Sequence, residues 1–151
     1  MSELAAVAAA TMAPILRDDL LVDESQLYHA RLHGADAAVL PAAELDATAL
    51  EDLVRVASSL HMGSVIEVLG PADLAAAARL PHVLLGLRCV QPDGRLDVPQ
   101  SLRLAQQAPG HTLLILPPIE SAEQCAALRG RVDGVFVDAA RLATGDVSAT
   151  L

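Results

Sequence analysis

Two spacings of hydrophobic residues alternate along the chain. Short apolar runs typical of strands occur six times, and the segments between them carry apolar residues three and four positions apart, as amphipathic helices do. The six runs are "PILR", "AAVLP", "SVIEVL", "VLLGLR", "TLLILP" and "GVFVDA". Strands that are apolar on both faces and alternate with helices form parallel sheets covered by helices. The pattern therefore predicts an α/β fold with about six β/α units.

Polar residues and glycines mark the expected helix ends. Residues 23–25 (Asp-Glu-Ser) can begin the first helix after "PILR", and Gly34 can end it. Asp46 or Thr48 can cap the next helix, for which Gly63 is the expected end. This local pattern fits either an open doubly wound sheet or part of a (β/α) barrel.

Composition favours one compact domain over residues 1–151. The chain is 53% hydrophobic with a mean hydropathy of +0.42, which is enough apolar surface for a sizeable core. Tyr28 and Phe136 are its only aromatic residues apart from histidine, so the core must be aliphatic. A platform on which nucleic-acid bases stack is not expected.

The charge of the chain excludes several partners. Its formal net charge is −9, all ten of its basic residues are arginine, and they form no basic run, so nucleic acid and anionic membrane surfaces are not expected partners. The longest apolar stretch, residues 4–16, is interrupted by Thr11 and Pro14 and is shorter than a membrane span. Because Glu3 stands where a secretion signal carries positive charge, we expect a cytoplasmic protein.

No cofactor and no metal site are predicted. Cys89 and Cys125 lie far apart in the sequence and are expected to be reduced, buried thiols. His29 and His33 are four positions apart on an expected helix, which is a spacing found in zinc sites. No third ligand lies nearby, so they are expected to be surface histidines.

Two stretches carry a family resemblance. "LAAVAAATMAPILRDDLLVDESQLYHARLHGADAAVLPAAELD" resembles indole-3-glycerol phosphate synthase, whose third strand reads P-V-L-R-K-D-F before a helix that closes on A-x-x-x-G-A-D. "LHMGSVIEVLGPADLAAAARL" is similar to the family's L-G-M-x-x-L-V-E-V-H-x-x-x-E-L around its fifth strand. The likeness covers most of the chain and weakens through "LLGLRCVQPDGRLDV" and "GRVDGVFVDAARL".

The resemblance implies a TIM barrel with its active site at the carboxyl ends of the strands. The family is a carboxy-lyase of tryptophan biosynthesis that closes the indole ring. This chain is expected to be an incomplete barrel that begins at the helix before barrel strand three.

Catalytic positions of the family are only partly kept. The lysine of P-V-L-R-K-D-F, a catalytic acid in the family, corresponds to Asp18, and a carboxylate cannot act as a cationic acid. Because the chain has no lysine, Schiff-base chemistry is excluded as well. Glu67 matches the strand-five glutamate, whereas Arg88 and Val90 replace the asparagine and arginine of the strand-six motif G-x-N-x-R-x-L.

The phosphate-binding positions of the family also differ. Pro117 and Pro118 replace a hydroxyl residue and a glycine in its S-E-S-G element. Asp138 stands in its V-G-E-S element, where backbone amides approach the phosphate. Proline removes an N–H donor and aspartate adds a like charge, so both changes oppose phosphate binding.

Two interpretations of the residual site stay open. Glu67 and Arg88 are expected to face each other from neighbouring strands, either as a structural ion pair or with Glu67 as a working acid or base. Asp18 and Asp19 fit a solvated strand end or a helix cap, and also a site for a divalent metal or a cationic ligand.

Three functions follow. The chain is a degenerate family member, a pseudoenzyme kept as a binding or interaction protein; or a lyase completed by another chain; or an acid/base enzyme that uses Glu67 with Asp18 or Arg88 on another substrate. A small molecule is an expected ligand. Because "PILR" and "GVFV" would be open sheet edges, we expect a homo-oligomer or a complex with a complementing chain.

Overall fold

All six expected strands form one parallel sheet. The computed structural model describes residues 3–108 and 110–137, and its strands pair in the order β1-β2-β3-β4-β5-β6, each with its neighbour in sequence. The strands are β1 (Leu16–Arg17), β2 (Ala37–Pro41), β3 (Gly63–Val68), β4 (Leu84–Leu87), β5 (Leu113–Ile119) and β6 (Gly134–Val137).

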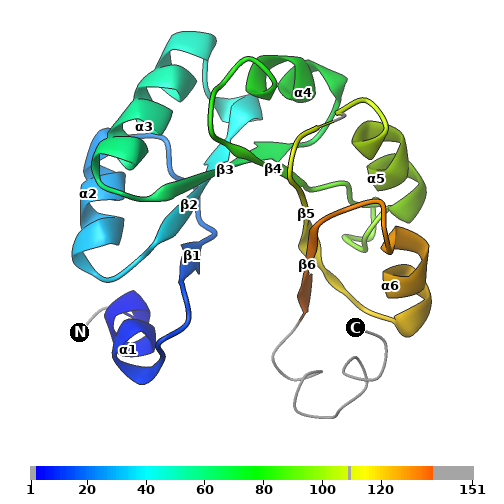
Figure 1. The fold of residues 1–151 in the computed structure, drawn as a ribbon, viewed down its shortest axis with the longest axis horizontal. Coiled ribbons are helices and arrows are strands. Elements are labelled where there is room, and N and C mark those ends of the chain that lie inside the picture. The colour runs from blue at the N-terminus through cyan, green and yellow to red at the C-terminus, as the bar shows by residue number, and fades with distance from the viewer. Residues whose placement is uncertain (1–2, 109, 138–151) are drawn as a thin grey trace.

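Helices cover one side of this sheet. Figure 1 shows the sheet curved into an arc, with β1 and β6 at its two ends and the helices on the outside. This is the predicted incomplete TIM-barrel-like α/β fold. The helices are α1 (Glu3–Ala10), α2 (Glu24–Leu32), the 3-10 turn η1 (Ala42–Glu44), α3 (Ala47–Ser59), α4 (Pro71–Ala77), α5 (Val98–Ala105) and α6 (Ala122–Leu128).

Side-chain caps begin the first two α-helices after β1, as predicted. The carboxylate of Asp23 accepts a hydrogen bond from the N–H of Ser25, while the Gln26 side chain accepts one from the N–H of Asp23. Asp46 caps α3 by accepting a hydrogen bond from the N–H of Ala49. These caps satisfy donors that would otherwise lack a partner in the first turn.

The prediction that Gly63 ends α3 is wrong. His61 takes the left-handed conformation after the helix, with a φ of 56°. The N–H of His61 donates to the carbonyl of Ser58, and that of Met62 donates to the carbonyl of Ala57. These two bonds form a Schellman motif, which needs the left-handed residue directly after the C-cap and leaves Gly63 free to begin β3.

The core has two unequal parts. The larger part lies between the sheet and the helices and includes Leu27, Leu50, Ile66, Leu85 and Ile115. The smaller part lies on the inner face of the sheet, where Val39, Val65 and Leu116 are buried and Leu16, Leu84 and Leu114 pack at its margin. Strand alternation therefore sends every second side chain towards the concave side.

Candidate charged site at the strand ends

Three charged residues meet at the carboxyl ends of the strands. Asp18 directly follows β1, Glu67 is the next-to-last residue of β3, and Arg88 directly follows β4. Glu67 is two positions after the inner-face residue Val65, so strand alternation places its side chain on the concave side of the sheet. Parallel strands bring their carboxyl ends to the same edge, which explains why residues so distant in sequence are neighbours.

Arg88 joins the other two residues of this cluster. Its Nε donates to a carboxylate oxygen of Glu67, and its Nη2 lies 2.5 Å from Oδ1 of Asp18. The side chains of Glu67, Arg88 and Asp18 are 16%, 29% and 44% exposed, respectively. The ion pair expected between Glu67 and Arg88 is present, and Asp18 extends it to the end of β1.

The carboxylates of Asp18 and Glu67 favour the charged form of Arg88. Partial burial by itself disfavours the guanidinium charge, but the hydrogen bonds to Asp18 and Glu67 outweigh burial and raise the pKa of Arg88 above its usual value. Both bonds engage donor groups of the guanidinium that a bound anion would otherwise use.

The cavity at this site carries excess negative charge. It has a volume of about 290 Å³, and its charged lining residues are Asp18, Asp19, Glu67 and Arg88. Asp18 and Glu67 face the guanidinium of Arg88, while Asp19 pairs with Arg17, so one carboxylate is in excess. An anionic ligand would meet a repulsive field here, whereas a neutral or cationic ligand would not.

Asp19 also forms a local ion pair. Its Oδ2 lies 3.1 Å from Nη2 of Arg17, and this hydrogen bond is the main cause that lowers the pKa of Asp19. Asp18 and Asp19 therefore each contact an arginine. In the described part of the chain, no group of three or more histidine, cysteine, aspartate or glutamate residues is arranged to hold a metal ion.

Prolines disturb the end of β5. Pairing of β5 with β6 shifts in register between Ile115 and Ile119, which is the segment that contains Pro117 and Pro118. Proline has no N–H to donate to a neighbouring strand or to a phosphate, so a bulge at this point is expected. Asp138, the other position predicted to oppose phosphate binding, lies outside the described residues.

The remaining candidate residues take structural positions. His29 and His33 lie close together on one side of α2 with ring centroids 4.1 Å apart, and Nδ1 of His33 is 2.8 Å from the carbonyl oxygen of His29. Cys89 and Cys125 are free and buried, as expected. Burial raises the pKa of the Cys89 thiol, which keeps it protonated and unreactive at neutral pH.

The sequence did not reveal two features. It placed Asp18, Glu67 and Arg88 in one residual site but did not predict the direct contact between Asp18 and Arg88, because β1 and β4 are not neighbours in the sheet. It also gave no sign of a groove between α3 and the turn before β4, which has a cavity volume of about 690 Å³. The polar residues at "LHMGS" and "LPH" were the only available signal, and they resemble ordinary turn residues.

A curved parallel sheet of six strands with helices outside and charged side chains at its carboxyl edge is the arrangement of an incomplete (β/α) barrel. Residues 1–151 match the family "Indole-3-glycerol phosphate synthase", and the chain belongs to this family. The indole-3-glycerol phosphate synthase of Acidithiobacillus ferrooxidans is 33% identical over 138 residues, which cover 89% of this chain and 52% of the relative. That of Aromatoleum aromaticum is 44% identical over 84 residues, which cover 56% of this chain and 32% of the relative. The chain thus spans about half or less of these relatives' lengths.

Solved structures share the fold at low sequence identity. The tryptophan synthase alpha subunit of Legionella pneumophila aligns with a TM-score of 0.62 and 16% identity, covering 89% of this chain and 54% of that one. KGPDC of Streptococcus mutans aligns with a TM-score of 0.64 and 13% identity, covering 97% of this chain and 74% of that one. In the described residues of our chain, no helix is long and apolar enough to cross a membrane.

Proposed function

We propose that this chain is a non-catalytic member of the indole-3-glycerol phosphate synthase family that serves as a binding or interaction protein. The observation that carries the proposal is the position of Asp18. It stands where the family resemblance expects a catalytic lysine, and its carboxylate is bound to Arg88. The site therefore contains an internal ion cluster where the lyase needs a free cationic acid.

The charges of the cluster oppose the substrate of the lyase. That substrate, a carboxyphenylamino-deoxyribulose phosphate, carries a carboxylate and a phosphate. The cavity beside Glu67 presents more carboxylates than guanidinium groups, and the one guanidinium at this point already contacts two of them. Binding the substrate would require breaking these ion pairs, and the guanidinium of Arg17, at the end of β1, is itself paired with Asp19.

A neutral or cationic ligand fits the cluster better. The lining also includes the apolar side chains of Leu20, Val39 and Pro41, which add apolar contact surface. A ligand of this kind could contact Glu67 and Asp18 without displacing Arg88. We therefore propose that the chain binds a ligand at the cluster of Asp18, Glu67 and Arg88 and does not convert it.

Calorimetric titration of the chain with the lyase substrate tests this proposal. We expect no saturable heat for the native chain. The Asp18→Asn variant, which removes one like charge and releases one hydrogen bond of Arg88, should bind the anion more tightly than the native chain. Saturable binding of the substrate by the native chain, unaltered in Asp18→Asn, would contradict the proposal.

One observation supports a second candidate, a lyase completed by another chain. This chain spans about half the length of the Acidithiobacillus relative, and β1 pairs only with β2 among the described residues. A partner that supplies further β/α units at this edge could also supply lysines. Lyase activity that appears only when a complementing barrel fragment is added would favour this candidate.

Glu67 would carry the third candidate, an acid/base enzyme of altered chemistry. Its carboxylate is mostly buried and lines the cavity, as a general acid or base should. Its carboxylate is already engaged by the hydrogen bond from Arg88, which weakens this candidate. Loss of a measurable reaction in Glu67→Gln, with stability unchanged, would favour it.

A further inference from the structure

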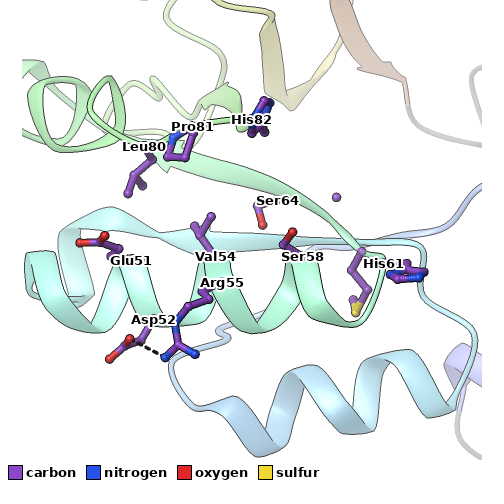
Figure 2. Close-up of a pocket in the computed structure, with 12 residues that line it drawn as sticks. Glu51, Asp52, Val54, Arg55, Ser58, His61, Ser64, Leu80, Pro81 and His82 are labelled. Atoms are coloured by element: carbon purple, nitrogen blue, oxygen red, sulfur yellow. Dashed lines mark hydrogen bonds and ion pairs between the residues drawn. The ribbon is translucent and has the colours of Figure 1, made fainter.

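A second cavity lies away from the strand-end cluster, at the amino end of β3. It is the groove of about 690 Å³ between α3, the first residues of β3 and the turn before β4. Figure 2 shows Val54 and Ser58 projecting from α3 towards the strand, with Leu80, Pro81 and His82 on the far side. This volume lies within the range of small-molecule sites.

Ser64 points into this groove without a partner. Ser64 is only 5% exposed, and Figure 2 shows its hydroxyl directed towards α3. Among the described residues, no group forms a hydrogen bond with this hydroxyl. The buried side-chain atoms without a partner among the described residues are Nη1 of Arg17 and Nδ1 of His111, so the Ser64 hydroxyl is accessible from the cavity. It can therefore donate to and accept from a molecule bound there.

The walls around Ser64 combine apolar and polar groups. Met62 is buried and Val54 and Leu80 are partly buried, which gives the groove an apolar lining. Ser58 extends its hydroxyl from α3 on the side that faces Ser64. A ligand in this groove would therefore contact aliphatic side chains and reach one or two hydroxyl groups.

The rim of the groove is acidic. Glu51 and Asp52 lie at the same end of α3, and Asp52 pairs with Arg55 at 2.8 Å. The hydrogen bond from Arg55 to Asp52, together with the charges of Asp52, Glu24 and Glu51, raises the pKa of Arg55. Two carboxylates and one guanidinium leave an excess negative charge, so the rim favours a cation.

Backbone conformation singles out the same groove. The two non-glycine residues with positive φ in the described part of the chain are His61 (56°) and His82 (58°), and both line it. A left-handed conformation costs a non-glycine residue roughly 1–2 kcal/mol. The Schellman motif at the end of α3 accounts for the conformation of His61, so His82, in the turn before β4, is the strained residue that lacks this explanation.

We propose that this groove binds a small molecule that has a compact apolar body, a group that hydrogen-bonds the Ser64 hydroxyl, and a protonated amine placed near Glu51. The apolar lining accounts for the body and the unpartnered hydroxyl accounts for the hydrogen-bonding group. The acidic rim accounts for the positive charge. This site is independent of the proposed function at the strand ends.

Tyramine is a suitable probe, and 4-hydroxyphenylacetate is its counterpart of similar shape and opposite charge. We expect tyramine to shift the amide resonances of Ser58, His61 and Ser64 saturably, with a Kd on the order of 1 mM. We expect 4-hydroxyphenylacetate to bind at least about fivefold more weakly. Absence of saturable shifts at these residues with tyramine, or equal binding of the two probes, would overturn the proposal.

Matched variants identify the contacts. Ser64→Ala should weaken tyramine binding by about three- to tenfold, because it removes one hydrogen bond. Glu51→Gln should weaken it about two- to fivefold. The controls are Ser59→Ala, whose hydroxyl donates to the carbonyl of Val56, and Glu123→Gln on α6. Unchanged binding in both test variants, or equal losses in the controls, would overturn the proposal.

Discussion

Arg88 and Asp18 are 70 positions apart in the sequence, and their side chains are 2.5 Å apart in the fold. Their contact spans three neighbouring strand pairs, from the end of β1 to the end of β4. With Glu67 as a second partner of Arg88, it forms an ion cluster at the edge where (β/α) barrels carry out their chemistry. We expect this cluster to oppose the binding of an anion at the site.

A double-mutant cycle measures the pair of Arg88 and Glu67. Arg88→Met should lower the free energy of unfolding by about 1–2 kcal/mol, because it leaves a mostly buried carboxylate without its partner and part of the loss is screened by solvent. Glu67→Leu combined with Arg88→Met should recover most of this loss. Urea denaturation gives the four stabilities, and strictly additive losses would show that the two residues do not interact.

An exposed pair provides the control for that cycle. Arg55 and Asp52 lie 2.8 Å apart, with side chains 71% and 48% exposed. Arg55→Met should change the free energy of unfolding by no more than about 0.5 kcal/mol. A loss as large as that of Arg88→Met would mean that burial does not set the difference.

Gly86 on β4 should not tolerate a side chain. A Cβ at this position would lie 2.7 Å from Cδ1 of Leu116 and 2.8 Å from Cγ1 of Val65. Gly86→Ala should therefore destabilise the protein by about 1–3 kcal/mol, because it overpacks the inner face. Gly70, around which a Cβ would meet no atom within 4 Å, is the control. Because Gly70 is the N-cap of α4, where alanine is less favourable than glycine, Gly70→Ala should cost no more than about 0.5 kcal/mol in thermal unfolding. Equal effects of the two changes would contradict the packing of Leu116 against β4.

His61→Gly should stabilise the protein. His61 follows α3 with a φ of 56°, a conformation that glycine adopts without strain. The relief of strain exceeds the added flexibility of the unfolded chain, so we expect a gain of about 0.5–1 kcal/mol in urea denaturation. The same change at His33, whose φ is −96°, should give no gain. A loss of stability in His61→Gly would show that the imidazole makes contacts worth more than the strain.

How much the sequence predicted depends on the range of the interactions. The spacing of apolar residues and the turn residues located all six strands. Asp23 and Asp46 were among the candidate helix starts, which also included Thr48, because capping acts within a few residues. Glu67 and Arg88 could be paired because their strands are neighbours. The contact of Asp18 with Arg88 required the curvature of the sheet, and no local pattern contains that information.

The groove at Ser64 was missed for a related reason. Its walls come from three segments whose separation depends on how α3 and the turn before β4 pack on the sheet. The left-handed conformation of His61 was missed because a glycine two positions later looked like the more suitable helix end. Glycine has the strongest propensity for this conformation, but the hydrogen bonds of the last turn of α3 place it at His61.

The open edges of the sheet predict association. Among the described residues, β1 pairs only with β2 and β6 only with β5, and Phe136 of β6 is 37% exposed. Unpaired edge groups and exposed apolar surface favour pairing with a second chain. Light scattering at micromolar concentration should therefore give a mass above that of the monomer. A monomer that binds no hydrophobic dye would contradict this expectation.

The most direct test of the account is an assay of indole-3-glycerol phosphate formation by the purified chain. Asp18 stands where the family has a cationic acid, and Arg88 is already bound by two carboxylates. Both features oppose the reaction. Loss of a general acid alone lowers rates by about 10²–10⁴. We expect no product above that of a heat-treated sample. Turnover above that control, lost in Glu67→Gln, would contradict this prediction.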